Sequence, residues 1–336
     1  MTYFALDVHK STSTVAYLDP SGGPVQVRRI YTRREDLAHL LGDLPGPWIV
    51  ALEATRSAPA VCAWLRELDA EIHLVDPQKL SALAALRAAK TDAKDAELML
   101  EALLHDYLPE AYLASPEVSE DRDLMRCHTA LRRVSTHLRN LLRALLARQG
   151  VELAATDLCG QAAQEALDKL QQTLAPLAAL LCQVYRSLLA QVEHALGVVR
   201  EQIQTRVAAS PLAQRLLLQP GKGPLTTLGL LAEIGDPARF PSYKQLVSYA
   251  GLAPRVAQSG DRCATGHLPQ RCSRRLRHWA VLAAQCAARS RRPSPARHAY
   301  RRVCVRHGPN AAKIAAAREI LRDVYFAAQR LRAEAA

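Results

Sequence analysis

The stretch Tyr3-Phe4-Ala5-Leu6-Asp7-Val8 decides the fold of the first part of this 336-residue chain. Its apolar residues are typical of a buried strand, and one charged residue, Asp7, stands among them. A carboxylate in a central strand costs free energy unless it has a partner or a metal ion. Asp7 is therefore the first candidate site residue.

Strand and helix signals alternate on the C-terminal side of this stretch. Strands are expected at 14–18 and 25–31, with the turn Asp19-Pro20-Ser21-Gly22-Gly23 between them. The remaining expected elements are a helix at 34–41, a strand at 48–53, a helix at 61–68 and a strand at 72–75. Three hairpin strands followed by alternating helix and strand is the order of a ribonuclease-H-like α/β fold.

Two more regions follow this α/β part. From Ser119 to Ser210, Leu and Ala recur at three- and four-residue spacing, which predicts long, coiled-coil-like helices that pack on one another or on a second subunit. The last third is expected to be an all-α basic domain. We therefore divide the chain into an α/β domain at 1–115, a helical linker at 116–210 and a basic helical domain at 211–336.

The positive charge is concentrated in the last of these regions. Lys and Arg minus Asp and Glu gives −5 over residues 1–115, +1 over 116–210 and +16 over 211–336. Such a basic segment is typical of a protein that binds the phosphate backbone of nucleic acids. A merely solvated surface is the alternative.

Candidate phosphate contacts lie in two places within this basic region. The first is the turn Pro220-Gly221-Lys222-Gly223-Pro224, where Gly221 and Gly223 let the backbone approach a phosphate and Lys222 adds a charge. A tight structural turn is the alternative. The second is a stretch of expected helix that contains the arginines Arg271, Arg274, Arg275 and Arg277.

Four acids stand where an α/β fold of this kind can bring them together. Asp7 lies in the first strand and Glu53 at the end of the fourth, and Asp92 and Asp95 share one face of a helix. Clustered carboxylates repel one another unless divalent cations offset their charge. We therefore predict that the four acids bind Mg²⁺ or Mn²⁺, although Asp92 and Asp95 taken alone are equally typical of a solvated helix.

The remaining features are weaker signals. The eight cysteines show no Cys-x-x-Cys pair, which favours free thiols, and Cys263, His267 and Cys272 lack the close spacing of a zinc site. No apolar stretch has the roughly 20 residues of a membrane span, and the N-terminus does not resemble an export signal. A cytoplasmic protein without membrane partners is expected.

Taken together, the motifs resemble the insertion-sequence transposases of the IS one-ten type, which are bridge-RNA-guided recombinases. In the first half the matching motifs are Ala5-Leu6-Asp7-Val8-His9-Lys10, Ala51-Leu52-Glu53-Ala54-Thr55, Val75-Asp76-Pro77, Lys90-Thr91-Asp92-Ala93-Lys94-Asp95-Ala96 and Leu138-Arg139-Asn140-Leu141-Leu142. In the last third they are Pro220-Gly221-Lys222-Gly223-Pro224, Leu231-Ala232-Glu233-Ile234-Gly235-Asp236, Arg239-Phe240-Pro241-Ser242, Tyr249-Ala250-Gly251-Leu252-Ala253-Pro254 and Gln258-Ser259-Gly260.

The resemblance implies a RuvC-like nuclease domain in which Asp7, Glu53, Asp92 and Asp95 hold Mg²⁺. It also implies a C-terminal transposase domain in which Ser259 is the catalytic nucleophile. The implied partners are double-stranded donor and target DNA, a structured guide RNA and further copies of the chain in a dimer or tetramer, all in a bacterial cytoplasm. The sequence departs from the family pattern at Arg56 and at Cys272-Ser273.

Two other functions fit parts of this pattern. A RuvC-type junction nuclease would hydrolyse phosphodiesters with the acids and would need no serine, so Ser259 discriminates it from a transposase. A nucleic-acid-binding adaptor would need neither the acids nor the serine. His267 is the histidine nearest to Ser259 in sequence, and it is either a general base or an ordinary loop residue.

Overall fold

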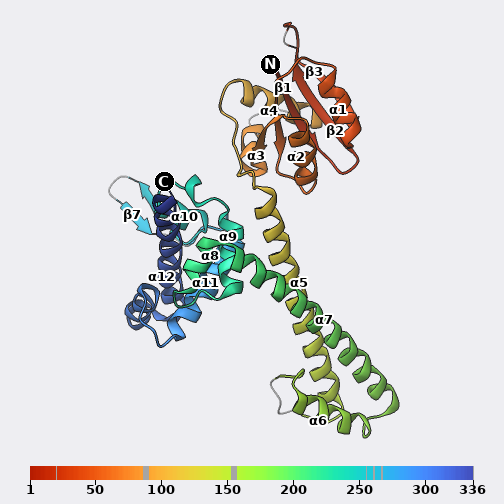
Figure 1. Cartoon of the computed structure of the whole chain (residues 1–336), viewed down its shortest axis with the longest axis vertical. Coiled ribbons are helices and arrows are strands. Elements are labelled where there is room, and N and C mark those ends of the chain that lie inside the picture. Colours follow the sequence, from red (N-terminus) through yellow and green to blue (C-terminus); the bar gives the residue numbers. More distant parts are fainter. Residues whose placement is uncertain are drawn as a thin grey trace. The chain divides into compact units, whose positions relative to one another are not determined.

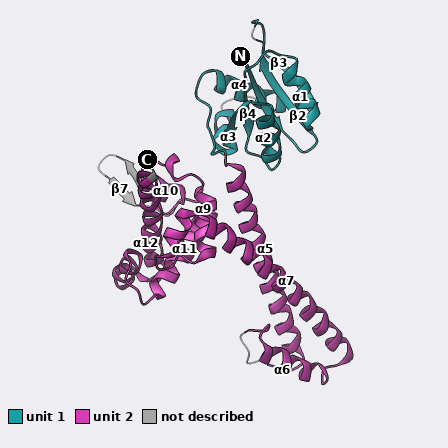
Figure 2. Cartoon of the chain, viewed as in Figure 1, with its two compact units in different colours: residues 1–113 teal, residues 114–336 magenta. Residues whose placement is uncertain are grey.

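The computed structural model describes residues 1–336 except 20, 86–90, 153–156, 255, 260–261, 266–267 and 336, and the side chains of 256–259, 262–265 and 335 are not described. The chain forms two compact units, residues 1–113 and residues 114–336 (Figure 2). Each unit has its own core.

The first unit is built on a five-stranded sheet with the order β3-β2-β1-β4-β5 (Figure 1). Its strands are β1 (Thr2–Val8), β2 (Thr12–Leu18), β3 (Gln26–Tyr31), β4 (Trp48–Glu53) and β5 (Glu71–Val75). The first three strands are antiparallel neighbours, whereas β4 and β5 run parallel to β1. The prediction of a mixed α/β domain with five strands is confirmed.

Helices of this unit pack on both faces of the sheet. They are α1 (Arg34–Gly42), α2 (Ala58–Glu67), α3 (Pro77–Ala84) and α4 (Asp92–Leu104). Side chains alternate along β1, so Phe4 and Leu6 share a core with α1 and α2, whereas Ala5 shares a core with α3 and α4. Small residues on the second face let α4 lie close to the central strand.

The second unit begins with two long helices, α5 (Pro116–Arg148) and α7 (Pro176–Ala209), with the short α6 (Gln161–Gln171) between them. The C-terminal half of α5 and the N-terminal half of α7 share a cluster of buried side chains that includes Leu142 and Cys182, so the two helices pack on one another. Within this pair Glu193 accepts hydrogen bonds from the Ser135 hydroxyl at 2.6 Å and from Arg139 Nη2 at 2.9 Å. This polar network fixes which faces of the two helices meet.

The N-terminal part of α5 and the C-terminal part of α7 belong to the core that the C-terminal helices form. Met125 of α5 and Ile203 of α7 are buried in one cluster with Trp279 and Ile320. The elements of this region are α8 (Pro211–Leu217), α9 (Pro224–Ile234), η1 (Pro237–Arg239), α10 (Tyr243–Tyr249), β6 (Val256–Ser259), β7 (Arg262–Thr265), α11 (Arg274–Arg289) and α12 (Pro295–Ala335). The last helix is broken at Gly308, where φ is 76° and Pro309 follows.

The expectation of an all-α C-terminal domain is wrong, because β6 and β7 form a two-stranded antiparallel sheet. Ser259 of β6 pairs with Arg262 of β7. Each strand has only four residues. So short a hairpin gives little periodic signal in a sequence, which is why this segment resembled an irregular loop.

Two smaller expectations can also be compared with the structure. The cysteines whose side chains are described are free thiols. Among the described residues, no helix is long and apolar enough to cross a membrane.

Candidate active site

Asp7 lies near the C-terminal end of the central strand β1, on the face that α4 covers. Its neighbour of the same face, Ala5, is fully buried against α4, and Asp7 itself is only 6 % exposed. Leu6 pairs with Leu52 of the parallel strand β4, so Glu53 comes one residue later at the same edge of the sheet. Because side chains alternate along β4, the half-buried Glu53 lies on the same face as Ala51 and Asp7.

Asp92 and Asp95 lie in the first turn of α4, whose N-cap is Thr91. The Thr91 hydroxyl accepts a hydrogen bond from the Lys94 backbone amide at 3.3 Å, which sets the start of the helix. Acidic residues in a first turn are stabilised by the helix dipole. Asp92 is exposed and Asp95 is half-buried, and both carboxylates act electrostatically on Asp7.

His9 is a member of this cluster that the prediction missed. Its Nε2 atom lies 3.3 Å from Oδ2 of Asp7 and 3.6 Å from Oδ2 of Asp92. One potential ligand atom from each of Asp7, His9 and Asp92 falls within a group whose members are all within 4.8 Å of one another. His9 stands two residues after Asp7, and its position directly after the end of the strand was the signal that could have marked it.

The environment of Asp7 disfavours its charged form. Burial raises the pKa of the Asp7 carboxyl above its ordinary value, and the charges of Asp92 and Asp95 raise it further, although His9 acts in the opposite direction. A divalent cation would remove this conflict, since it neutralises the carboxylates that repel one another. Carboxylate oxygens are the ligands that suit Mg²⁺ and Mn²⁺, and imidazole is a ligand of transition metals, so the residues fit a divalent cation.

Comparison with known proteins places the chain among transposases. Residues 4–149 match the family model of the DEDD transposase domain of the IS110 type, and residues 213–301 match the model described as transposase IS116/IS110/IS902 family. The chain belongs to the IS110/IS116/IS902 family of transposases. The resemblance to the IS one-ten type is thereby confirmed, and the enzyme is a DNA transposase or recombinase.

Relatives along most of the chain carry the same description. The chain is 29 % identical over 296 residues to a probable family 20 transposase of Pseudomonas aeruginosa, covering 86 % of each chain. It is 25 % identical over 294 residues to the transposase for insertion sequence element IS1328 of Yersinia enterocolitica, covering 85 % of this chain and 83 % of the relative. It is 26 % identical to the transposase for IS1111A of Coxiella burnetii, covering 76 % of this chain and 70 % of the relative.

The family bears on the acidic cluster and on the basic region. A DEDD transposase domain suggests the use of a divalent metal, and the cluster around Asp7 lies within the matched residues. A transposase also has to bind DNA.

The serine expected to be the nucleophile lies in the β6–β7 hairpin of the transposase. Ser259 is the last residue of β6, and its side chain is outside the described part of the chain. The same holds for the side chains of His267 and Cys263, so the alternatives of a general base and a zinc ligand fall outside the described residues. Cys272 is described, and its thiol lies 2.9 Å from Nη2 of Arg277.

The expected phosphate contact by Lys222 does not fit the structure. Its side chain is fully buried, and Nζ lies 3.1 Å from Oδ2 of Asp323 in α12. Gly221 also has a packing role, because φ is +87° and a Cβ atom there would lie 2.3 Å from the Ala283 carbonyl oxygen of α11. Gly223, the N-cap residue of α9, has open space around it. The turn thus fastens α9 to α11 and α12, and Gly223 is exposed.

The four arginines near α11 fall into two groups. Arg271, Arg274 and Arg275 are exposed, as a phosphate contact requires. Arg277 instead donates to the carbonyl oxygens of Ala250, Gly251 and Pro269, so its guanidinium holds a loop together. A phosphate contact by Arg277 does not fit these bonds.

Proposed function

We propose that this transposase cuts and rejoins the DNA of its insertion sequence with two sets of residues. The acids Asp7, Glu53, Asp92 and Asp95 hold one or two Mg²⁺ or Mn²⁺ ions, and the hydroxyl of Ser259 is the nucleophile. The observation that carries the metal part is the buried Asp7 carboxylate beside two further carboxylates and an imidazole. We propose that His9 is a further ligand of these ions.

The acids of the first unit act by position. Asp7 is fixed by the central strand and Asp92 by a capped helix end, so neither depends on a mobile loop for its placement. The divalent ion, when bound, supplies positive charge to a phosphodiester whose negative charge rises during phosphoryl transfer. Nε2 of His9 lies near the carboxylates of both Asp7 and Asp92, so the three donor groups converge on one point.

The serine carries the covalent step. Its Oγ–P bond forms as the bond from phosphorus to the leaving deoxyribose oxygen breaks, and the serine proton passes through solvent to that leaving oxygen. The reverse reaction with another DNA end releases the serine, so rejoining needs no external energy source. Hydrolysis by water would not conserve that energy.

Site choice by a structured guide RNA completes the proposal. It is supported by the charge of +16 over residues 211–336 in a sequence without a recognisable zinc finger or homeodomain. We also propose that the chain works as a dimer or tetramer on donor and target DNA in the bacterial cytoplasm. Residues 1–115, 116–210 and 211–336 then serve as the metal-binding, connecting and serine-bearing parts.

The test is a trapping experiment on labelled DNA. Purified protein is incubated with the DNA that flanks its element, with and without RNA transcribed from those flanks, then denatured and resolved by gel electrophoresis. We expect protein-bound label that Ser259→Ala removes and that Ser248→Ala, an exposed serine of α10, leaves unchanged. Normal joining by Ser259→Ala would instead support a junction nuclease, and joining at the native sites by protein free of RNA would refute RNA guidance.

A further inference from the structure

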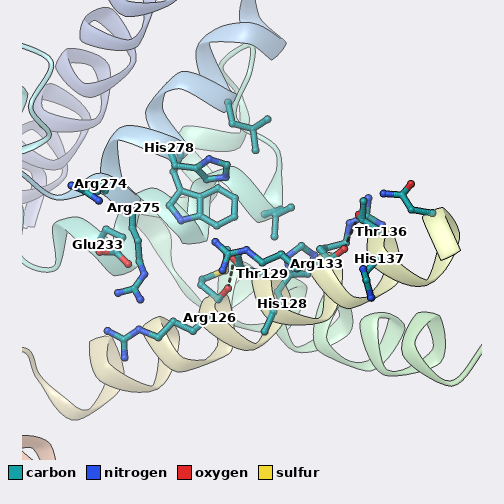
Figure 3. Close-up of a pocket in the computed structure, with 17 residues that line it drawn as sticks. Arg126, His128, Thr129, Arg133, Thr136, His137, Glu233, Arg274, Arg275 and His278 are labelled. Carbon is teal, nitrogen blue, oxygen red and sulfur yellow. Dashed lines mark hydrogen bonds between the residues drawn. The ribbon is translucent and has the colours of Figure 1, made fainter. Parts of the chain in front are cut away.

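A cavity of about 820 Å³ lies in the second unit, between α5, α9 and α11. Its walls come from segments that are far apart in sequence but packed in one core (Figure 3). Two motifs of the sequence analysis contribute to it without having been given a role, through Asn140 of α5 and Glu233 of α9. The cavity lies wholly within the second unit, whereas the acidic cluster around Asp7 lies in the first unit.

The lining of the cavity is strongly basic. Five arginines and one glutamate contribute to it. Among the described residues, no hydrogen bond or ion pair involves the guanidinium groups of Arg133, Arg274 and Arg275, whereas Arg277 nearby is bonded to three carbonyl oxygens. Figure 3 shows Arg275 of α11 pointing toward α5, next to Glu233. These cations are therefore available to an anion.

The position of Arg274 and Arg275 increases the positive potential. Both lie in the first turn of the 16-residue helix α11, which contains no acidic residue. Basic side chains at the N-terminus of a helix are opposed by the helix dipole, so the two arginines and the dipole together favour a negative ligand. Burial lowers the pKa of His128, which lines the same cavity, and the neighbouring Arg200 and Arg132 lower it further.

The cavity also has an apolar wall. Trp279, 5 % exposed, contributes part of its ring, and Leu225 and Leu282 lie beside it. The indole is held in place because Gly229 of α9 packs directly against it, where a Cβ atom would come within 2.5 Å of the ring. A ligand that fits here needs both negative charge and a flat or apolar part.

We propose that this cavity binds an unpaired nucleotide strand, with its phosphates on Arg133, Arg274 and Arg275 and a base turned toward Trp279. A paired base lies inside the stack of a duplex, so only an unpaired or flipped nucleotide can enter a cavity. Guanidinium planes and aromatic rings accept any base face, and Glu233 and Asn140 can accept from or donate to a base edge. This inference rests on the proposed function, because a transposase that exchanges strands must hold them unpaired.

The experiment compares strand affinity of the full chain and its variants by fluorescence anisotropy. The probes are a 12-nucleotide single-stranded DNA, an RNA of the same sequence and the matching DNA duplex. The cavity variant is Arg274→Gln/Arg275→Gln, and the matched control is Arg301→Gln/Arg302→Gln, which removes two exposed arginines from α12. Circular dichroism checks that both variants keep their helix content.

We expect the cavity variant to bind single strands at least about 10-fold more weakly than the control variant does, since each charge-assisted contact is worth more than a neutral one. The slope of log affinity against log salt concentration should become shallower by about 1.4, because each of the two lost phosphate contacts accounts for about 0.7. Duplex affinity should fall equally in the two variants. A larger loss for RNA than for DNA identifies the guide as the strand, and the reverse identifies a DNA strand.

Equal weakening of single-strand binding by the cavity and control variants would overturn the inference. A second measurement is independent of those variants: a strand containing 4-thiouracil or 4-thiothymine is photocrosslinked, and the attached peptides are sequenced. Crosslinks within residues 274–282 or 126–140 support the cavity, and crosslinks confined to other segments refute it. Failure here leaves the trapping of DNA on Ser259 unaffected, so the two proposals are tested separately.

Discussion

Lys222 and Asp323 form an ion pair across 101 residues of sequence, with Nζ of the lysine 3.1 Å from Oδ2 of the aspartate. The lysine side chain is fully buried, and burial lowers the pKa of its ammonium although Asp323 acts against this. The pair joins the turn before α9 to α12. A phosphate contact by this lysine does not fit its burial.

The first prediction concerns this pair. Asp323→Ala should destabilise the protein by about 3–5 kcal/mol, because it leaves a buried cation with only the uncharged amide oxygen of Gln219 as a partner. The double variant Lys222→Met/Asp323→Leu should recover most of that stability, and thermal unfolding measures both. The double variant should also keep the wild-type slope of log DNA affinity against log salt concentration. A slope that is shallower by about 0.9 would mean that Lys222 contacts a phosphate.

A second prediction concerns Gly251, which precedes the hairpin that carries Ser259. Its φ is +66°, and a Cβ atom there would lie 2.1 Å from Nη2 of Arg277 and 2.6 Å from Cβ of Cys272. Gly251→Ala should therefore cost about 2–5 kcal/mol, from backbone strain and overpacking together. The control is Gly150→Ala, where φ is +72° with open space around it, and where strain alone should cost about 1–2 kcal/mol. If urea unfolding shows that both variants lose the same unfolding free energy, the contact with Arg277 is not the reason why position 251 needs a glycine.

A third prediction concerns pH. His73 of β5 lies with Nε2 3.0 Å from Glu71 Oε1 and Nδ1 2.5 Å from Glu110 Oε1. Burial lowers the pKa of His73, but the hydrogen bonds and charges of Glu110 and Glu71 outweigh it, so the pKa is raised in the folded state. The resulting stabilisation is fully present below the unfolded pKa near 6.5 and is lost as pH rises through the folded value.

His73→Gln should therefore lower stability by up to about 1 kcal/mol at pH 5.5 and have a smaller effect at pH 9, because both carboxylates are largely exposed. Thermal unfolding across this range gives the difference. In the background Glu71→Gln/Glu110→Gln the same substitution should show no such trend with pH. A destabilisation that grows toward high pH would contradict the prediction.

The sequence sufficed for those parts of the fold and site that depend on local pattern. Asp7 is conspicuous because a charge interrupts an apolar strand, and Asp92 and Asp95 share a face through their spacing alone. The role of His9 depends on how the chain leaves β1 and meets the start of α4, which no periodicity encodes. The burial of Lys222 could not be predicted for the same reason, since its partner Asp323 is distant in sequence.

The cavity between α5, α9 and α11 could not be predicted from the sequence either. Arg274 and Arg275 could be predicted as phosphate contacts from local charge, but Arg133 lies about 140 residues earlier, in a region predicted only as long, coiled-coil-like helices. Only the packing of Met125 and Ile203 with the C-terminal helices brings these arginines to one place. Long-range packing therefore decides which charges of a basic protein act together.

The last prediction concerns the metal centre. Asp7→Asn, Glu53→Gln, Asp92→Asn and Asp95→Asn should each lower strand joining by at least about 100-fold, since even the outer partners of metal ligands are worth 10- to 100-fold. The matched control is Glu97→Gln in the same helix. Glu97 lies about 200° around the helix from Asp95 and so faces away from Asp7. His9→Gln should have a smaller effect that higher Mn²⁺ concentrations overcome, because all four carboxylates remain. Electron paramagnetic resonance of free Mn²⁺ measures binding directly, without relying on activity, and should show that Asp7→Asn weakens binding more than His9→Gln does. Wild-type joining at limiting Mg²⁺ by any two of the four acid variants would refute the assignment, as would Mn²⁺ binding that Glu97→Gln weakens as much as Asp7→Asn does.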